Sequence, residues 1–151
     1  MKPKNAITQE GFNRLLSSEK ELLKTRGVAV GLLAEYRAMG DLSENAAYRS
    51  ARWKLSSIDS QLRRLKHQIA TSEVAKRPSN EIAGIGSTVG VESEGKTYTY
   101  FLVGTYEADP LKNEITDRSP LGRNLFGKKP GDKISVLTPG GVKEFRIISV
   151  H

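Results

Sequence analysis

The spacing of apolar residues across the first half of the chain constrains the fold most strongly. Between Thr8 and Met39, a stretch without proline, one set of apolar side chains recurs every seven residues: Leu15, Leu22, Ala29 and Tyr36. A second, more regular stretch places Tyr48, Leu55, Leu62 and Ile69 at one heptad position and Ala51, Ile58, Leu65 and Ser72 at the other. A sustained heptad repeat predicts two long helices that pack along a coiled-coil seam.

Only a few residues separate the two predicted helices. So short a link cannot return the chain to its starting end, and it therefore predicts an antiparallel helical hairpin. Each arm has about 32 residues, which at a rise of about 1.5 Å per residue gives a length of roughly 48 Å. Gly27 lies inside the first arm and predicts a local bend or loosening there.

The helical pattern ends near residue 76. Pro78 disfavours helix in the residue before it and has no amide hydrogen of its own, so the chain is expected to leave the hairpin there. We therefore expect the hairpin to occupy residues 1–76, a linker to occupy 77–82, and a separate domain to occupy 83–151.

The last of these segments has the alternation of β-structure. Strands are predicted at 88–92, 97–103, 114–116, 133–137 and 143–150, and one short helix at 121–126. Glu94-Gly95 and Pro139-Gly140-Gly141 are typical of tight turns between strands. These elements predict a small, mostly antiparallel β domain with one helix, and hence an α+β protein.

The net charge is +7 and is unevenly distributed. Up to Lys76 there are 14 basic and 8 acidic residues, and beyond it 10 and 9, so the hairpin carries most of the excess. A basic surface favours anionic partners such as nucleic acid. The chain has no cysteine and two histidines, so any metal must be held by oxygen ligands. No window approaches the roughly 20 apolar residues of a membrane span, which predicts a cytoplasmic protein without membrane association.

The turn between the helices contains two carboxylates, Asp41 and Glu44, and allows two interpretations. In the structural one, Gly40 ends the first helix, Asp41 caps the second and Glu44 completes a capping box, with Ser43 as a rival cap. In the functional one, the carboxylates form a compact site for a hard cation. Two carboxylates cannot complete the octahedral shell of Mg²⁺, which also takes waters and substrate phosphates. Such a site suits a protein that completes the metal centre of another enzyme.

The same turn resembles the signature of the bacterial Gre transcript cleavage factors, GreA and GreB. The matching residues are Gly40-Asp41-Leu42-Ser43-Glu44-Asn45-Ala46, with Tyr48 after them. A second resemblance lies in the other half of the chain, in Ser119-Pro120-Leu121-Gly122-Arg123, Leu125-Phe126-Gly127-Lys128-Lys129, Gly131-Asp132 and Thr138-Pro139-Gly140-Gly141. The opening Ile7-Thr8-x-x-Gly11 also fits, so the resemblance extends over nearly the whole chain.

This resemblance implies both a fold and a mechanism. The fold is an N-terminal antiparallel coiled coil followed by a domain similar to FK506-binding proteins. Family members dock at the rim of the secondary channel of RNA polymerase and insert the coiled coil, and the polymerase then cleaves backtracked nascent RNA near its 3′ end. Asp41 and Glu44 become the pair that helps to hold a second Mg²⁺ supplied within the polymerase active site. The factor, expected to act as a monomer, is then not itself an enzyme.

Further residues take their expected roles from the same resemblance. Arg37, Arg49 and Arg52 would contact RNA phosphate or the channel wall, although charged side chains are also the ordinary solvated face of a coiled coil. Asp117, Ser119 and Pro120 stand where the family docks on the polymerase, although Ser-Pro is also an ordinary start of a short helix.

The chain departs from the family pattern at three places near or in the hairpin. Ala47 stands where the family often has an acid, which changes the charge at the tip. Trp53 lies in a region that is usually more polar, and we expect a packing or interface residue there rather than a base-stacking platform. Gly27 and Val28 replace a stretch that is often basic and contains proline.

Two other functions compete with transcript cleavage. A Gre-like inhibitor would dock at the same channel but withhold the metal or block the entry of nucleotides. The intact Asp41 and Glu44 argue against it. A protein-binding module or prolyl isomerase would use an aromatic pocket in the C-terminal half. The few aromatic residues there are about the number that an ordinary core needs.

Overall fold

The computed structural model describes residues 4–40, 45–76 and 78–151 and divides into two compact units. The hairpin unit comprises Asn13–Thr71. The sheet unit comprises Ser72–His151 together with the N-terminal segment that ends at Phe12. The N-terminal segment thus belongs with the C-terminal residues, and the boundaries expected at 1–76, 77–82 and 83–151 stay a prediction.

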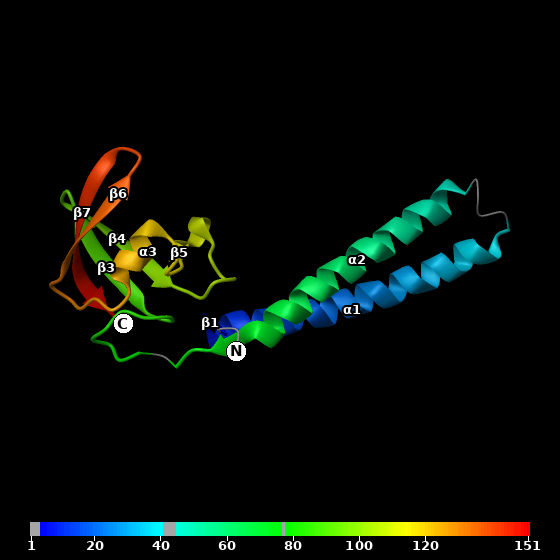
Figure 1. Ribbon diagram of the computed structural model, residues 1–151, viewed down its shortest axis with the longest axis horizontal. Coiled ribbons are helices and arrows are strands. Elements are labelled where there is room, and N and C mark those ends of the chain that lie inside the picture. The colour runs from blue at the N-terminus through cyan, green and yellow to red at the C-terminus, as the bar shows by residue number, and fades with distance from the viewer. Residues whose placement is uncertain (1–3, 41–44, 77) are drawn as a thin grey trace. The chain divides into compact units, whose positions relative to one another are not determined.

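Two helices, α1 (Gln9–Ala38) and α2 (Ala46–Thr71), lie side by side in the hairpin unit (Figure 1). With 30 and 26 residues they are about 45 and 39 Å long at about 1.5 Å per residue. The residues that α2 buries are Tyr48, Ala51, Ile58, Leu62 and Leu65. Ala29 of α1 is buried against Ile58 and Leu62, and Leu22 and Leu55 pack against this cluster. The predicted coiled-coil seam is confirmed.

Three details of the predicted hairpin differ from the structure or refine it. Helix α1 continues through Gly27 without interruption, so the expected loosening there is not seen. The seam was expected to include Ser72, but α2 ends at Thr71 and Ser72 begins a short strand. Leu16, Leu23 and Val30 of α1 are apolar too, but each is more than 40% exposed and lies outside the buried seam.

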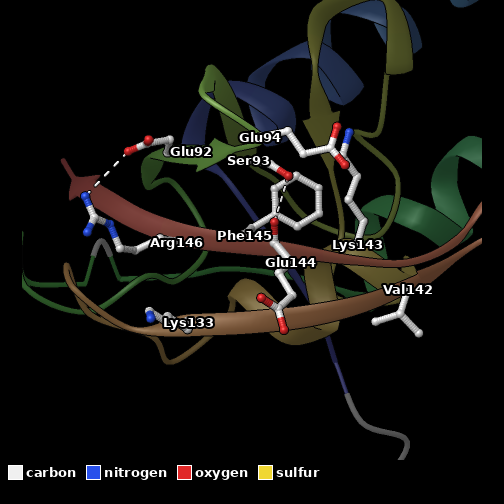
Figure 2. Close-up of a pocket in the computed structure, with 9 residues that line it drawn as sticks. All are labelled: Glu92, Ser93, Glu94, Lys133, Val142, Lys143, Glu144, Phe145 and Arg146. Carbon is white, nitrogen blue, oxygen red and sulfur yellow. Dashed lines mark hydrogen bonds and ion pairs between the residues drawn. The ribbon is translucent and has the colours of Figure 1, made fainter.

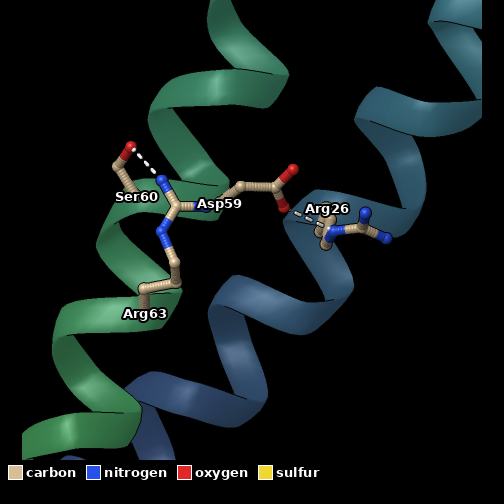
Figure 3. Close-up of polar contacts among 4 residues, drawn as sticks. All are labelled: Arg26, Asp59, Ser60 and Arg63. Atoms are coloured by element: carbon tan, nitrogen blue, oxygen red, sulfur yellow. Dashed lines mark hydrogen bonds and ion pairs between the residues drawn. The ribbon is translucent and has the colours of Figure 1, made fainter.

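A charged pair joins the two helices beside the seam. Nε of Arg26 on α1 donates to Oδ1 of Asp59 on α2 at 2.6 Å (Figure 3). On the solvent side of α2, the guanidinium of Arg63 donates to the hydroxyl of Ser60 one turn earlier at 3.0 Å. Because both members of the Arg26 and Asp59 pair are partly exposed, the ion pair contributes less to stability than the buried seam but specifies how the helices align.

Helix α2 has its own cap. The side-chain oxygen of Asn45 accepts a hydrogen bond from the amide of Tyr48 at 3.1 Å, and its carbonyl accepts from the amide of Arg49 at 3.1 Å. This is the geometry of an N-cap, which satisfies backbone donors that have no partner inside the helix. Helix α2 therefore starts without needing a cap from Asp41 or Ser43, which lie outside the described residues.

The sheet unit is built on five described strands in the order β5-β4-β3-β7-β6. The strands are β3 (Thr88–Ser93), β4 (Lys96–Leu102), β5 (Glu114–Ile115), β6 (Lys133–Thr138) and β7 (Gly141–Val150). Neighbouring strands are antiparallel except β4 and β5. The mostly antiparallel sheet is therefore confirmed, with each predicted strand within about two residues of its place.

One face of the sheet carries the core. Val89 and Val91 of β3 and Ile147 of β7 are almost fully buried there, and Leu125 of the short helix α3 (Pro120–Leu125) is fully buried in the same cluster. The chain turns from β3 to β4 through Glu94 and Gly95, which both have positive φ angles, 53° and 76°. Positive φ angles at both residues are typical of the two-residue turn that joins the strands of a β-hairpin.

A small pairing of strands was not predicted. Strand β1 (Asn5–Ile7) pairs in parallel with β2 (Ser72–Val74), so the residues before α1 lie beside the residues after α2. Three-residue strands without alternation give no sequence signal, because the pattern that identifies a strand needs about four residues or more. A 3₁₀ turn, η1 (Pro110–Lys112), was also missed.

We expect seam packing to outweigh the ion pair in stabilising the hairpin. Ile58→Ala removes a side chain that is 4% exposed and should lower the free energy of unfolding by about 2–5 kcal/mol. Asp59→Asn keeps the shape and should cost under about 1 kcal/mol. Urea unfolding followed by helical circular dichroism measures both, and an equal loss for the two variants would contradict this ranking.

The cap at Asn45 gives a second prediction. Asn45→Ala should destabilise the hairpin by about 1 kcal/mol, because the amide of Tyr48 loses its acceptor, whereas Asn45→Asp should keep the cap. Thermal unfolding of the two variants tests this. Equal melting temperatures for Asn45→Ala and the parent protein would show that another residue caps α2.

Candidate hairpin-tip site

The two carboxylates of the expected metal site lie outside the described residues. Asp41 and Glu44 fall between Gly40, which follows α1 with a φ of 107°, and Asn45, which caps α2. A positive φ at glycine is typical of a helix end. The metal-binding role of Asp41 and Glu44 therefore stays a prediction.

The cap at Asn45 bears on the choice between the two interpretations of the tip. The structural interpretation needed a carboxylate at the start of the second helix, and Asn45 now fills that position. This cap was not predicted, although asparagine is among the preferred N-cap residues. The signal that could have found it is the heptad phase, since Tyr48, the first seam residue of α2, is the third residue of the helix.

The expected RNA-contacting arginines are exposed at this end of the hairpin. Arg37 is in the last turn of α1, and Arg49 and Arg52 lie on the first two turns of α2. Helix α2 as a whole carries six Lys and Arg residues and a single carboxylate, Asp59. Because Arg26 of α1 pairs with that carboxylate, the outer face of α2 keeps a positive charge that suits an anionic partner.

Trp53 is not a packing residue within the hairpin. Its side chain is 76% exposed on the second turn of α2, one residue after Arg52. We expected either a packing residue or an interface residue at Trp53, and packing against the described residues is wrong. Tryptophan so exposed on a charged helix is typical of a surface that another molecule covers.

The expected docking residues lie at the start of α3. The hydroxyl of Ser119 accepts from the amide of Gly122 at 2.9 Å and donates to the carbonyl of Thr116 at 2.8 Å, so it caps α3. Pro120 follows as the first helical residue and is exposed, as is Asp117. Ser119 thus has a structural role that needs no docking, while Asp117 and Pro120 are accessible to a partner.

An open groove at one end of the sheet unit does not suit a prolyl isomerase. About 470 Å³ in volume, it is lined by three carboxylates, Glu92, Glu94 and Glu144, three cations, Lys133, Lys143 and Arg146, and one aromatic ring, Phe145, with Ser93 and Val142 (Figure 2). Lys143 lies over the rings of Tyr98 and Phe145. A small-molecule or proline pocket is mainly apolar, so the charged groove gives this alternative no support.

The electrostatics of the sheet unit add one perturbed group. Burial raises the pKa of the Tyr100 phenol above its usual value, and the neighbouring Tyr98 raises it further. Tyr100 packs against the core, so this shift reflects packing rather than a reactive site.

In residues 4–40, 45–76 and 78–151, no group of three or more His, Cys, Asp or Glu side chains is placed to hold a metal ion. Over the same ranges, none of the helices is both long and apolar enough to span a bilayer.

Comparison with known proteins identifies the family. Residues 5–74 match the family described as "Transcription elongation factor, N-terminal", and residues 78–151 match "Transcription elongation factor, GreA/GreB, C-term". The chain is 37% identical to the transcription elongation factor GreA of Syntrophobacter fumaroxidans over 99% of both chains. It is 38% identical to GreA of Syntrophus aciditrophicus over 98% of this chain and 95% of that one.

A solved structure, the GreA factor homolog 1 of Thermus thermophilus, is similar over 98% of this chain and 99% of that one, with 26% identity and a TM-score of 0.47. Both halves of the chain thus match the same family, in the same order and over nearly their whole length. The chain belongs to the GreA/GreB family of transcription elongation factors.

Proposed function

We propose that this protein stimulates the cleavage of backtracked nascent RNA by RNA polymerase and so rescues arrested transcription complexes. The observation that carries the proposal is the family match over both halves, together with the Asp41 and Glu44 pair in the tip sequence. The protein acts as a monomer in the cytoplasm, and the bond is broken in the polymerase active site rather than in the factor.

The hairpin unit supplies what this function needs. The arms of α1 and α2 are about 45 and 39 Å long, and buried apolar contacts hold them together along the seam. A rod of this kind can carry a small acidic site into a channel. The exposed Asp117 and Pro120 are the residues we assign to docking, and the positive face with Arg37, Arg49 and Arg52 to contacts with RNA or the channel wall.

Asp41 and Glu44 are the residues that would hold the shared Mg²⁺. Their carboxylate oxygens are the ligand type that this ion prefers, and two such groups leave room for waters and RNA phosphate in its shell. When bound, the ion would lower the pKa of a water for attack on the phosphodiester and stabilise the developing charge. The role of this chain is to place two negative charges, and Asn45 lets it do so without using them as helix caps.

Removing the tip charges tests the proposal. With the double variant Asp41→Asn and Glu44→Gln, a backtracked polymerase complex should release RNA fragments about 100-fold more slowly than with the parent protein at the same Mg²⁺ concentration. Helical content should not change, because Asn45 caps α2. Glu35→Gln, which removes an exposed carboxylate from α1, is the control and should cleave normally.

Two outcomes would contradict the assignment. Undiminished cleavage by the double variant would show that Asp41 and Glu44 do not carry the activity. If no RNA fragments appear with the parent protein and the polymerase adds nucleotides more slowly, the protein is instead a Gre-like inhibitor that docks at the same channel.

The exposed tryptophan gives a separate prediction about docking. If the channel wall or RNA covers Trp53, Trp53→Ala should raise the factor concentration needed for half-maximal cleavage by about tenfold or more, as for a tryptophan at the centre of an interface. Val28→Ala is a matched control, since Val28 is 74% exposed on α1. The same half-maximal concentration for both variants would place Trp53 outside the interface.

A further inference from the structure

The start of α1 is held by a buried carboxylate. Glu107 is 7% exposed, and one of its oxygens, Oε2, accepts from the amide of Thr8 at 2.8 Å and from the amide of Gly104 at 2.7 Å. The other oxygen, Oε1, accepts from the hydroxyl of Thr8. A carboxylate is stable in the interior only when its oxygens are well hydrogen-bonded, so these contacts explain how Glu107 can be buried.

The same contacts define where α1 begins. The hydroxyl of Thr8 accepts from the amide of Gly11 at 3.0 Å, and its carbonyl accepts from the amide of Phe12 at 3.0 Å, so Thr8 is the N-cap of α1. The carboxylate of Glu107 therefore lies against the positive end of a 30-residue helix. Negative charge there is stabilised by the helix dipole, which adds to the hydrogen bonds.

Two glycines leave room for this carboxylate. A β-carbon at position 11 would overlap the carboxylate of Glu107, and one at position 104 would overlap the backbone carbonyl of Ala6. Both positions must therefore lack a side chain while Glu107 is in place. The contact with Glu107 explains why the opening segment reads Ile7-Thr8-x-x-Gly11. This segment contains none of the residues assigned to the tip or to docking.

Neighbouring contacts tie further segments to the same point. Ile7 is fully buried, and its carbonyl accepts from the amide of Ala75, just after β2, at 2.9 Å. The amide side chain of Asn5 donates to the hydroxyl of Tyr106 at 3.0 Å. The residues before α1 thus contact the turn at 104–107, and the residues after α2 pair with them through β1 and β2.

We propose that Glu107 is a positioning residue for transcript cleavage, which fixes the first turn of α1 to the turn at 104–107 and so sets where the helix that leads to the tip begins. The inference rests on the proposed function. The tip must meet a metal centre in another protein, and a group displaced by about 1 Å can lose about 100-fold in rate. Loss of the anchor should therefore reduce cleavage at saturation while docking, which uses other residues, is kept.

Glu107→Gln is the main test, because glutamine keeps the size of the side chain but replaces one acceptor oxygen by a donor that opposes the amide or hydroxyl donors around it. Gly11→Ala is a second variant that displaces the carboxylate without removing it. Glu10→Gln is the matched control, since Glu10 is an exposed carboxylate in the same first turn of α1.

Two measurements on the full chain separate position from stability. Amide hydrogen exchange by NMR should be about tenfold faster for Thr8 and Gly104 in Glu107→Gln, while Val89 and Val91 in the central strand stay protected. In the cleavage assay, the maximal rate should fall about tenfold with the half-maximal factor concentration within about twofold of the parent value. Gly11→Ala should behave in the same way and Glu10→Gln like the parent.

The outcomes distinguish failure of the inference from failure of the proposed function. Unchanged exchange at Thr8 and Gly104 in both variants would show that Glu107 does not hold the helix start. Faster exchange with an unchanged maximal rate would show that the anchor exists but does not position the tip. If the parent protein itself stimulates no cleavage, the proposed function fails, whereas the exchange measurement still decides whether the anchor is real.

Discussion

Burial of a narrow apolar seam is the interaction on which the hairpin depends. The two helices meet through Ala29, Ile58 and Leu62, with Leu22 and Leu55 beside them, and most other side chains of α1 and α2 face solvent. Burying one Leu or Ile side chain contributes roughly 1.5–3 kcal/mol, whereas a partly exposed ion pair such as Arg26 and Asp59 contributes between about 0 and 1 kcal/mol. The seam thus supplies the stability, and the charges remain available for alignment and for contacts with partners.

A seam of this kind stabilises a pair of helices along their length but leaves their ends to local contacts. At one end Asn45 caps α2. At the other, Thr8 caps α1 and is in turn held by the buried carboxylate of Glu107, and β1 pairs with β2. Each end therefore has its own polar arrangement, and neither needs the residues that we assign to chemistry or to docking on the polymerase.

Sequence periodicity predicted the parts of the fold that repeat. The heptad seam and the four longer strands, β3, β4, β6 and β7, gave clear patterns because each side chain on a buried face adds to the same signal. The three-residue strands β1 and β2 did not, and neither did the anchor at Glu107, because Thr8 and Glu107 are 99 residues apart and nothing local marks their contact. We predicted that the second helix would end near residue 76, but the chain leaves α2 after Thr71 and forms β2 from Ser72.

The candidate site was predictable only where it resembles a known motif. The spacing of Asp41 and Glu44 suggested a cation site, whereas the link to the metal of the polymerase and the docking residues came from the resemblance. The family comparisons do not test these side chains. Exposure could not be predicted for Trp53, since a large aromatic residue in a helical pattern is more often buried than exposed. The cap at Asn45 was predictable in principle, but Asp41 and Ser43, which precede it, fit the same rule.

The cap at Asn45 has a consequence for how such a protein can evolve. Because Asn45 caps α2, we expect helix initiation to depend little on positions 41 and 44, to which we assign the metal. Natural selection can then act on the chemistry of the tip alone. Under the proposed function, one or two codon changes at the tip could then strengthen, weaken or abolish the activity while α2 keeps its cap.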